Sequence, residues 1–285
     1  MSGVLDPGRD AVLQKGRWAA NRWLLLRRAS QFGLLGLFLL GPWAGVWFVK
    51  GNLASSMTLG VLPLTDPFVL LQTLATRHWP QASALVGAFV VLLAYAVLGG
   101  RVFCSWVCPM NLVTDAAAFT RRRLGLRGSR SPSRNTRLWL LGAVMAVAAI
   151  TGVAAWEFIN PVTTWHRTLV FGGLAGWLLA GGIFVYDTAV AHHGWCGHVC
   201  PQGALYGLIG KASLLRVSAA RRSQCNDCGD CLVICPETPV IAPALKGKGS
   251  PVILASDCTN CGRCIDVCSR DVFRFTTRFD QRSPS

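Results

Sequence analysis

Twelve cysteines provide most of the chemistry available to this chain of 285 residues. Eight of them form two runs with the same spacing, C-x2-C-x2-C-x3-C, and a proline follows the first run. The runs are Cys225, Cys228, Cys231 and Cys235, then Cys258, Cys261, Cys264 and Cys268. This double run is the pattern of bacterial ferredoxins, in which cysteine thiolates hold two [4Fe–4S] clusters. The spacing therefore predicts a two-cluster domain that relays single electrons.

The ferredoxin pattern also predicts how the ligands divide, because the fourth cysteine of each run ligates the other cluster. The first cluster is expected to use Cys225, Cys228, Cys231 and Cys268, and the second Cys258, Cys261, Cys264 and Cys235. Zinc is the main alternative, since Cys-x2-Cys pairs also bind zinc. Two equal runs of four cysteines favour iron–sulfur clusters over zinc.

The remaining four cysteines form two pairs, Cys104/Cys108 and Cys196/Cys200, each with i, i+4 spacing and a following proline. On an α-helix this spacing places both sulfurs of a pair on one face. If the pairs converge, four thiolates would suit a third iron–sulfur cluster, zinc or copper(I). A redox-active dithiol is another candidate role. The simplest alternative is that these are small buried residues at a helix junction.

The composition indicates a membrane protein. Hydrophobic residues make up 52% of the chain and charged residues only 14%, against about 25% charged residues in soluble domains. A membrane helix needs about 20 apolar residues. Four uncharged stretches approach this length: Ser30–Val49, Ala82–Gly100, Leu138–Trp156 and Thr168–Tyr186. We therefore expect an α-helical integral membrane protein with four transmembrane helices and a C-terminal α+β domain of the two-[4Fe–4S] ferredoxin type.

The distribution of positive charge predicts the topology. The formal net charge is +15, and Lys and Arg concentrate before the first stretch, after the second and after the fourth. The positive-inside rule then places both termini and the connection after the second stretch in the cytoplasm. This topology explains the charge without a nucleic-acid partner. The expected domains are a basic N-terminal segment (1–29), a four-span membrane domain (30–216) and a cytoplasmic ferredoxin-type domain (217–285).

Two parts of the membrane domain repeat each other. Phe103–Pro109 (FCSWVCP) and Trp195–Pro201 (WCGHVCP) each follow an apolar stretch, and Asp66-Pro67 upstream matches Asn160-Pro161. The offsets between matched positions are nearly constant. This predicts two copies of a helix–loop–helix–cysteine unit in parallel orientation, related by an axis along the membrane normal. Chance similarity is the alternative, because matches outside the cysteine motifs are few.

These features together resemble the NapH family of membrane ferredoxin-type proteins. The likeness covers the two cysteine-pair motifs, the double ferredoxin run, Leu64–Pro67, Ile159–Pro161 and Asp271–Phe273. Relatives that share the cysteine pairs are MauN of methylamine utilisation, the membrane part of NosR, and FixG/CcoG of oxidase assembly. The resemblance implies the quinol dehydrogenase component of a periplasmic nitrate reductase system, acting in a complex. It further implies a NapG-like periplasmic polyferredoxin and a NapC-like c-type cytochrome as partners.

Quinol as substrate would require a proton acceptor in a part of the chain where ionisable residues are rare. Ionisable groups near lipid are functional candidates, and Asp66, His78, His166 and His193 are the candidates for a quinol site. A cytoplasmic cluster domain and a periplasmic partner lie on opposite sides of the membrane, a gap that the four paired cysteines could bridge. Three alternative functions remain. They are copper handling or assembly of the FixG/CcoG type, a MauN-like role, and a docking scaffold with structural clusters.

Overall fold

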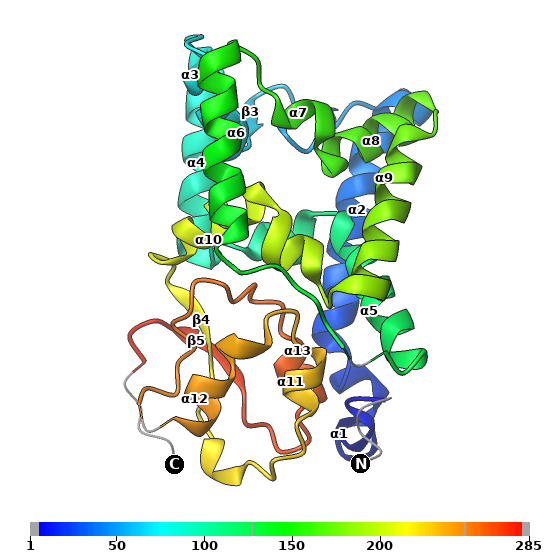
Figure 1. Cartoon of the computed structure of the whole chain (residues 1–285), viewed down its shortest axis with the longest axis vertical. Helices are drawn as coiled ribbons and strands as arrows, with labels where there is room; N and C mark the ends of the chain where they lie inside the picture. Colours follow the sequence, from blue (N-terminus) through cyan, green and yellow to red (C-terminus); the bar gives the residue numbers. More distant parts are fainter. Residues whose placement is uncertain (1–5, 127, 248, 281–285) are drawn as a thin grey trace.

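The computed structural model describes residues 6–126, 128–247 and 249–280. Apolar helices from the first three quarters of the chain stand side by side, and a smaller cysteine-rich unit lies at one end of them (Figure 1). Residues 1–5 of the expected N-terminal segment and 281–285 of the expected ferredoxin-type domain lie outside the described residues, as do Arg127 and Lys248.

The first half of the helical part begins with two helices and a small sheet. Its elements are α1 (Arg9–Ala19), α2 (Arg22–Ala44), β1 (Val49–Gly51), β2 (Ser55–Thr58), β3 (Leu62–Thr65), α3 (Pro67–Ala75), α4 (Ala82–Leu98), the π-helical turn η2 (Phe103–Val107) and α5 (Met110–Arg123). The three strands form an antiparallel sheet in the order β1-β2-β3. The sequence analysis did not anticipate this sheet, which connects α2 to α3.

The second half repeats much of this order without the sheet. Its elements are α6 (Thr136–Thr151), α7 (Trp156–Ile159), α8 (Pro161–Phe171), α9 (Ala175–Val185), the π-helical turns η3 (Tyr186–Val190) and η4 (Trp195–Val199), and α10 (Pro201–Gly210). In each half a capped short helix (α3 or α8) is followed by an apolar helix (α4 or α9), by one or two π-helical turns, and by a helix that begins at or directly after a proline.

The short helices α3 and α8 start in the same way. Asp66 caps α3 by accepting a hydrogen bond from the Phe68 amide at 2.8 Å, and Asn160 caps α8 by accepting one from the Val162 amide at 3.0 Å. A proline follows each cap, in the first helical turn where its missing N–H costs nothing. The two halves therefore share local structure as well as the cysteine motif, as the repeat predicted.

The apolar helices differ in length from the expected spans. Among the described residues one helix, α2 with 23 residues, is long and apolar enough by length and composition to cross a membrane. The apolar helices at Ala82–Leu98, Thr136–Thr151 and Ala175–Val190 are shorter. The expected span Thr168–Tyr186 is wrong as a continuous helix, because the chain turns between α8 and α9. Gly172 and Gly173 make this turn with φ of 80° and 105°, a region that glycine enters readily.

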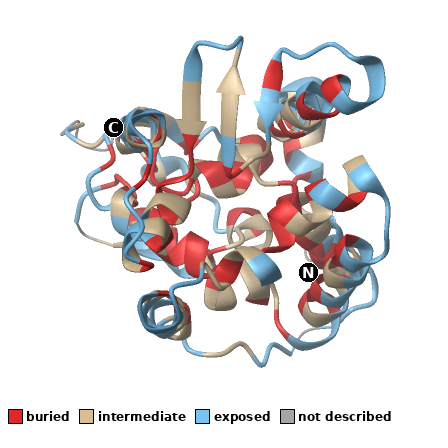
Figure 2. Ribbon diagram, turned by 90° about the horizontal axis from the view of Figure 1, so that it is seen from above, coloured by how far each residue is buried: buried red, intermediate tan, exposed pale blue. Residues whose placement is uncertain are grey.

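The cysteine-rich unit contains a two-stranded sheet and short helices. Its elements are β4 (Leu215–Ser218), η5 (Arg222–Gln224), α11 (Asp230–Ile234), η6 (Thr238–Val240), α12 (Ala242–Lys246), α13 (Arg263–Val267) and β5 (Arg274–Thr277). Strands β4 and β5 pair antiparallel, with Leu215 opposite Thr277. Val217, Ile241, Ile253, Val267 and Val272 are buried with several cysteines in one core. Seen from above, buried residues gather in the middle of the molecule and exposed ones ring it (Figure 2).

Candidate iron–sulfur sites

The first candidate site is a cavity in the cysteine-rich unit. Cys225, Cys228, Cys231 and Cys268 all line it. Gly229 precedes α11 with φ of 82° and lets the chain turn tightly between two of these cysteines. The amides of Asp227 and Val272 donate to the sulfurs of Cys225 and Cys268, both at 3.4 Å. Such N–H groups favour the charged thiolate that binds iron.

The second candidate site is a cavity lined by Cys235, Cys258, Cys261 and Cys264. Each of the two cavities is thus lined by three cysteines of one run and the fourth cysteine of the other. That these two sets are the cluster ligands stays a prediction. Gly262 precedes α13 with φ of 73°, and a Cβ at this position would lie 2.5 Å from the Trp23 ring. The turn that carries Cys261 and Cys264 therefore needs glycine for both its backbone conformation and its packing against α2.

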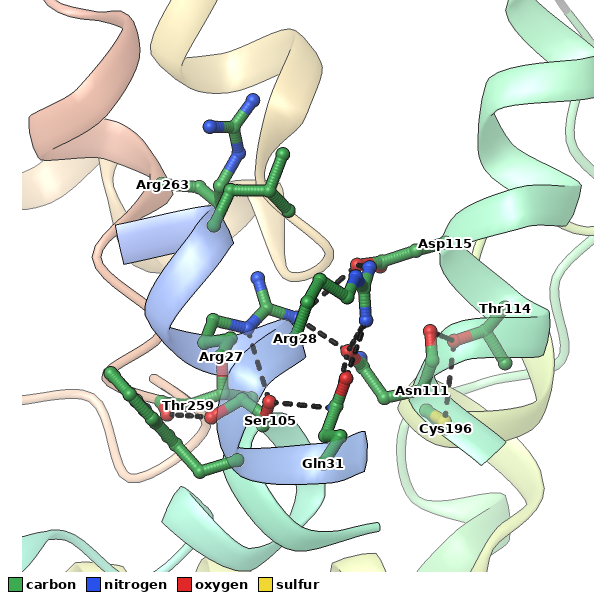
Figure 3. A network of polar contacts seen from close by, with 12 residues as sticks. Arg27, Arg28, Gln31, Ser105, Asn111, Thr114, Asp115, Cys196, Thr259 and Arg263 are labelled. Carbon is green, nitrogen blue, oxygen red and sulfur yellow. Dashed lines mark hydrogen bonds and ion pairs between the residues drawn. The ribbon is translucent and has the colours of Figure 1, made fainter. Parts of the chain in front are cut away.

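The third candidate site lies at the π-helical turns, where Cys104, Cys108, Cys196 and Cys200 line one cavity together. The expectation of α-helical i, i+4 geometry was wrong, because Cys104 and Cys196 lie in five-residue π-helical turns. Cys108 and Cys200 are in extended conformation after those turns. The Gly203 amide donates to the Cys200 sulfur at 3.4 Å. The Cys196 sulfur lies 4.0 Å from the Thr114 hydroxyl (Figure 3).

The donor sets of the two cavities in the cysteine-rich unit fit an iron–sulfur cluster, because they consist of thiols alone. Burial and the neighbouring Cys268, Cys228 and Cys225 raise the pKa of Cys231 to about 12. Burial raises the pKa of Cys258 to about 11. Four such thiols can ionise together only if a cationic group compensates their charge, as the irons of a cluster do. Within 6–126, 128–247 and 249–280, no three His, Cys, Asp or Glu side chains are grouped to hold a single metal ion.

The second and third sites are joined by direct contacts. Arg101, which is fully buried, donates to the Cys196 carbonyl at 2.8 Å and to the Asp257 carbonyl at 3.2 Å. The Ser105 hydroxyl donates to the Thr259 carbonyl at 2.7 Å, as Figure 3 shows. The Trp106 indole N–H donates to the Asn260 carbonyl at 3.1 Å. The chain around Cys104 therefore touches the chain around Cys258 without an intervening layer.

A buried ion-pair cluster reinforces the same junction. Arg101 pairs with Glu237 at 2.7 Å, and Arg134 pairs with Glu237 at 2.8 Å. Arg137 contacts Asp257, next to Cys258. The sequence analysis missed these residues. The available signal was their place beside the cysteine motifs: Arg101 precedes Phe103-Cys104, and Glu237 follows Cys235-Pro236.

The four candidate quinol residues lie in different places. Asp66 is buried and accepts a hydrogen bond from the Tyr206 hydroxyl at 2.9 Å and one from the Gln202 amide. Gln202 lines the third cavity, so Asp66 lies one residue away from that site. His78 is exposed near Thr76, His166 packs on Phe38 with ring centroids 5.7 Å apart, and His193 lines a pocket beside α5. The structure does not bring these four together.

Comparison with protein families matches both cysteine-containing parts of the chain. A family described as "4Fe-4S binding domain" matches residues 81–127 and 170–219, which hold the two cysteine pairs. A family described as "4Fe-4S dicluster domain" matches residues 224–272, which hold both ferredoxin runs.

Curated relatives are similar over nearly the whole chain. "Methylamine utilization ferredoxin-type protein MauN" of Methylorubrum extorquens is 50% identical, and the match covers 96% of each chain. "Ferredoxin-type protein NapH" of Escherichia coli is 48% identical over 98% of each chain. NapH of Haemophilus influenzae is 48% identical over 96% of each chain. No solved structure matches the chain.

Proposed function

Because the chain belongs to the family of ferredoxin-type proteins that includes NapH and MauN, we propose that it is a membrane component that oxidises quinol and passes electrons to a partner protein. One observation carries this proposal. Three cavities, each lined by four cysteines, occur in one chain, and two of them are in direct contact through Arg101, Ser105 and Trp106.

The proposed cofactors are two [4Fe–4S] clusters in the cysteine-rich unit and a third iron–sulfur cluster at Cys104, Cys108, Cys196 and Cys200. The match of the region around the cysteine pairs to a 4Fe-4S binding family supports iron over zinc or copper at the third site. Each cluster would accept and release one electron at a time. The third site is rich in apolar lining residues such as Phe103 and Trp156, which suits a centre next to lipid.

The proposed membrane placement follows the apolar helices. Helices α2, α4, α6 and α9 would cross the bilayer, with the basic segments and the cysteine-rich unit on the cytoplasmic side. Helices α3 and α8 are then half-helices, whose capped N-termini approach the third site from within the membrane domain. Irregular backbone at such a depth is tolerated where it is buried in protein, and Asp66 and Asn160 are both buried.

Quinol oxidation releases two electrons and two protons to give quinone. In the proposed reaction the electrons leave singly, through the third site and then the two ferredoxin clusters or directly to an iron–sulfur or haem partner. Asp66 is the proposed acceptor of one proton, because it is the candidate nearest to a cysteine cavity and is already linked to Tyr206 and Gln202 by hydrogen bonds. The second proton passes to water at the surface.

The proposed electron acceptors are a NapG-like polyferredoxin and a NapC-like cytochrome, leading to a periplasmic nitrate reductase. A methylamine-utilisation role is the second candidate, and the 50% identity to MauN favours it as strongly as the 48% identity favours NapH. The two candidates share the chemistry of the chain and differ in the protein that receives the electrons.

The test is anaerobic reduction of the purified chain in lipid by a quinol analogue, followed by EPR. The proposal expects cluster signals to grow with quinol and to disappear when the partner polyferredoxin is added in oxidised form. Clusters that dithionite reduces but quinol does not would contradict quinol oxidation. Stoichiometric copper binding at the third site, without iron there, would instead favour a metal-handling role.

A further inference from the structure

A pocket of about 470 Å³ lies where the start of α2, α5 and the cysteine-rich unit meet. We call it the junction pocket. Its ionisable lining comes from four separate parts of the chain. These lining residues are Asp6, Arg27, Arg28, Asp115, Arg122, His193 and Arg263. None of the cysteine cavities includes these side chains except Arg263, which also lines the second one.

Two of the four arginines share Asp115 as a partner. Arg27 lies 3.2 Å from the Asp115 carboxylate, and Arg28 also contacts it (Figure 3). The Asn111 amide oxygen accepts further hydrogen bonds from both. Arg263 pairs with Asp266 at 2.9 Å, but that carboxylate also accepts the Trp23 and Leu24 amides. Asp115 and Asp266 are thus already engaged. Asp6, the other acidic residue of the pocket lining, is exposed and attracts Arg122.

Arg122 is left without such a partner. It is half-buried, and within the described part of the chain its side chain makes no hydrogen bond and no ion pair. Burial lowers the pKa of Arg122, and the like charges of Arg263 and Arg123 lower it further against the attraction of Asp115 and Asp6. His193, buried on the facing segment, adds a ring that makes no side-chain hydrogen bond in the described residues. The four arginines of the junction pocket outnumber the nearby carboxylates of Asp6, Asp115 and Asp266, so the pocket keeps a net positive charge.

We propose that the junction pocket binds the phosphate group of an anionic ligand, with Arg122 and Arg263 as its main contacts. Arginine presents a planar fork of donors that matches phosphate oxygens and strengthens the bond through charge. The remaining walls include Leu24, Leu112 and Phe119, which suit an acyl chain. Basic pockets on the cytoplasmic side of membrane helices bind lipid head groups in this way. A soluble phosphate compound offers the same chemistry, so the test must separate the two.

A bound phosphate would tie the membrane helices to the cysteine-rich unit. Arg122 comes from α5, Arg263 from the start of α13 between Cys261 and Cys264, and Arg28 from α2. A ligand that contacts all three arginines can bind only when the cysteine-rich unit is packed against the membrane helices. Its binding therefore stabilises this packed arrangement by mass action. This inference is independent of quinol oxidation, since it concerns residues that the proposed electron route does not use.

The experiment uses the full chain with its clusters, prepared anaerobically. One arm counts bound phospholipid by native mass spectrometry after reconstitution in phosphatidylcholine with or without phosphatidylglycerol. The other arm measures thermal stability in neutral detergent with inorganic phosphate or pyrophosphate. The variants are Arg122→Gln and Arg263→Gln. The matched control is Arg123→Gln, which removes the same charge from the same helix. Arg123 does not line the pocket itself, and its guanidinium stacks on the ring of the wall residue Phe119.

The proposal expects Arg122→Gln to weaken binding about tenfold or more, the effect of losing one charge-assisted hydrogen bond. Arg122→Gln is the cleaner variant because it breaks no existing contact. Retention of phosphatidylglycerol alone identifies a lipid site, and stabilisation by phosphate or pyrophosphate alone identifies a soluble ligand. Equal loss in Arg123→Gln would show general surface attraction and overturn the proposal. Failure of every anion to bind the wild-type chain would overturn it as well.

Discussion

The guanidinium of Arg101 donates to the carboxylate of Glu237 across 2.7 Å, and both side chains are almost fully buried. Arg101 lies just before the first cysteine pair, and Glu237 lies just after the first ferredoxin run. The same guanidinium also reaches the Cys196 carbonyl. One side chain therefore fixes the third candidate site relative to the second, which sets the distance over which an electron would pass.

Replacing Arg101 should loosen the cysteine-rich unit from the helices. Arg101→Gln leaves the buried Glu237 with fewer positive partners, and removing one member of a buried pair costs about 3–5 kcal/mol. We expect lower thermal stability and faster proteolysis between α10 and β4. Arg134→Gln is the control, because the Arg134 side chain contacts the same carboxylate but is a third exposed. We expect it to lower the free energy of unfolding less than Arg101→Gln does, and an equal loss would contradict this expectation.

Replacing the fourth cysteine of each run by serine tests whether the two runs share their ligands in the crossed way. Cys235→Ser should remove the cluster held by Cys258, Cys261 and Cys264, although Cys235 belongs to the other run. Cys268→Ser should remove the cluster that includes Cys225. Each variant should lose about four irons, the content of one cubane, as measured by iron analysis and EPR. Loss of the cluster in the same run would show that the ligands are not crossed.

The third site should be needed for quinol-dependent electron transfer and not for the ferredoxin clusters. Cys104→Ser and Cys200→Ser each remove one thiol from the cavity that holds both pairs. We expect EPR signals of the two ferredoxin clusters to persist while reduction of the partner by quinol is lost. Val107→Ala is the control, because Val107 shares the π-helical turn but does not line the cavity. Unchanged turnover in Cys104→Ser would reject the bridging role.

Asp66 should matter for proton removal rather than for folding. Asp66→Asn keeps the side-chain oxygen that caps α3 at Phe68 but no longer accepts a proton, and it loses the acceptor of the Gln202 amide unless that amide turns over. General base catalysis typically contributes a factor of about 10²–10⁴, so quinol-dependent reduction should slow within that range while dithionite reduction is unchanged. Glu157→Gln provides a matched carboxylate control that is hydrogen-bonded to Asn160 instead. A rate unaffected by Asp66→Asn would remove this residue from the mechanism.

The contribution of Asp115 to the free energy of unfolding should depend on pH only in the acidic range. Burial acts to raise the pKa of Asp115, but Arg27, His193 and Arg28 hold it below its ordinary value of 3.8. A carboxyl group whose pKa is lower in the folded protein than in the unfolded chain stabilises the fold at pH values above its ordinary pKa. This stabilisation is lost as the pH falls through the lowered pKa. Asp115→Asn should therefore cost about 1–3 kcal/mol at neutral pH. Unfolding measured down to low pH should show this difference shrinking, and a constant difference would contradict the assignment.

Part of the site was predictable because cluster ligands are encoded by local spacing. Cys225, Cys228 and Cys231 lie within one short turn, so their pattern alone indicates a cluster-binding loop. The repeat of the Asp66-Pro67 and Asn160-Pro161 caps was also readable, since capping depends on neighbouring residues. Hydropathy was a poorer guide: the stretch at Thr168–Tyr186 reads as one span, but Gly172 and Gly173 divide it between two helices.

By itself the sequence determined the ferredoxin pattern, the two cysteine pairs, the basic segments and the apolar stretches, because each is a property of residues near one another in the chain. Only the tertiary structure decided that the four paired cysteines share one cavity and that Arg101 joins it to the second site. It also assembled the junction pocket from Arg122 and Arg263, which are far apart in sequence. Contacts of this kind depend on how helices pack, and neither periodicity nor spacing records that packing.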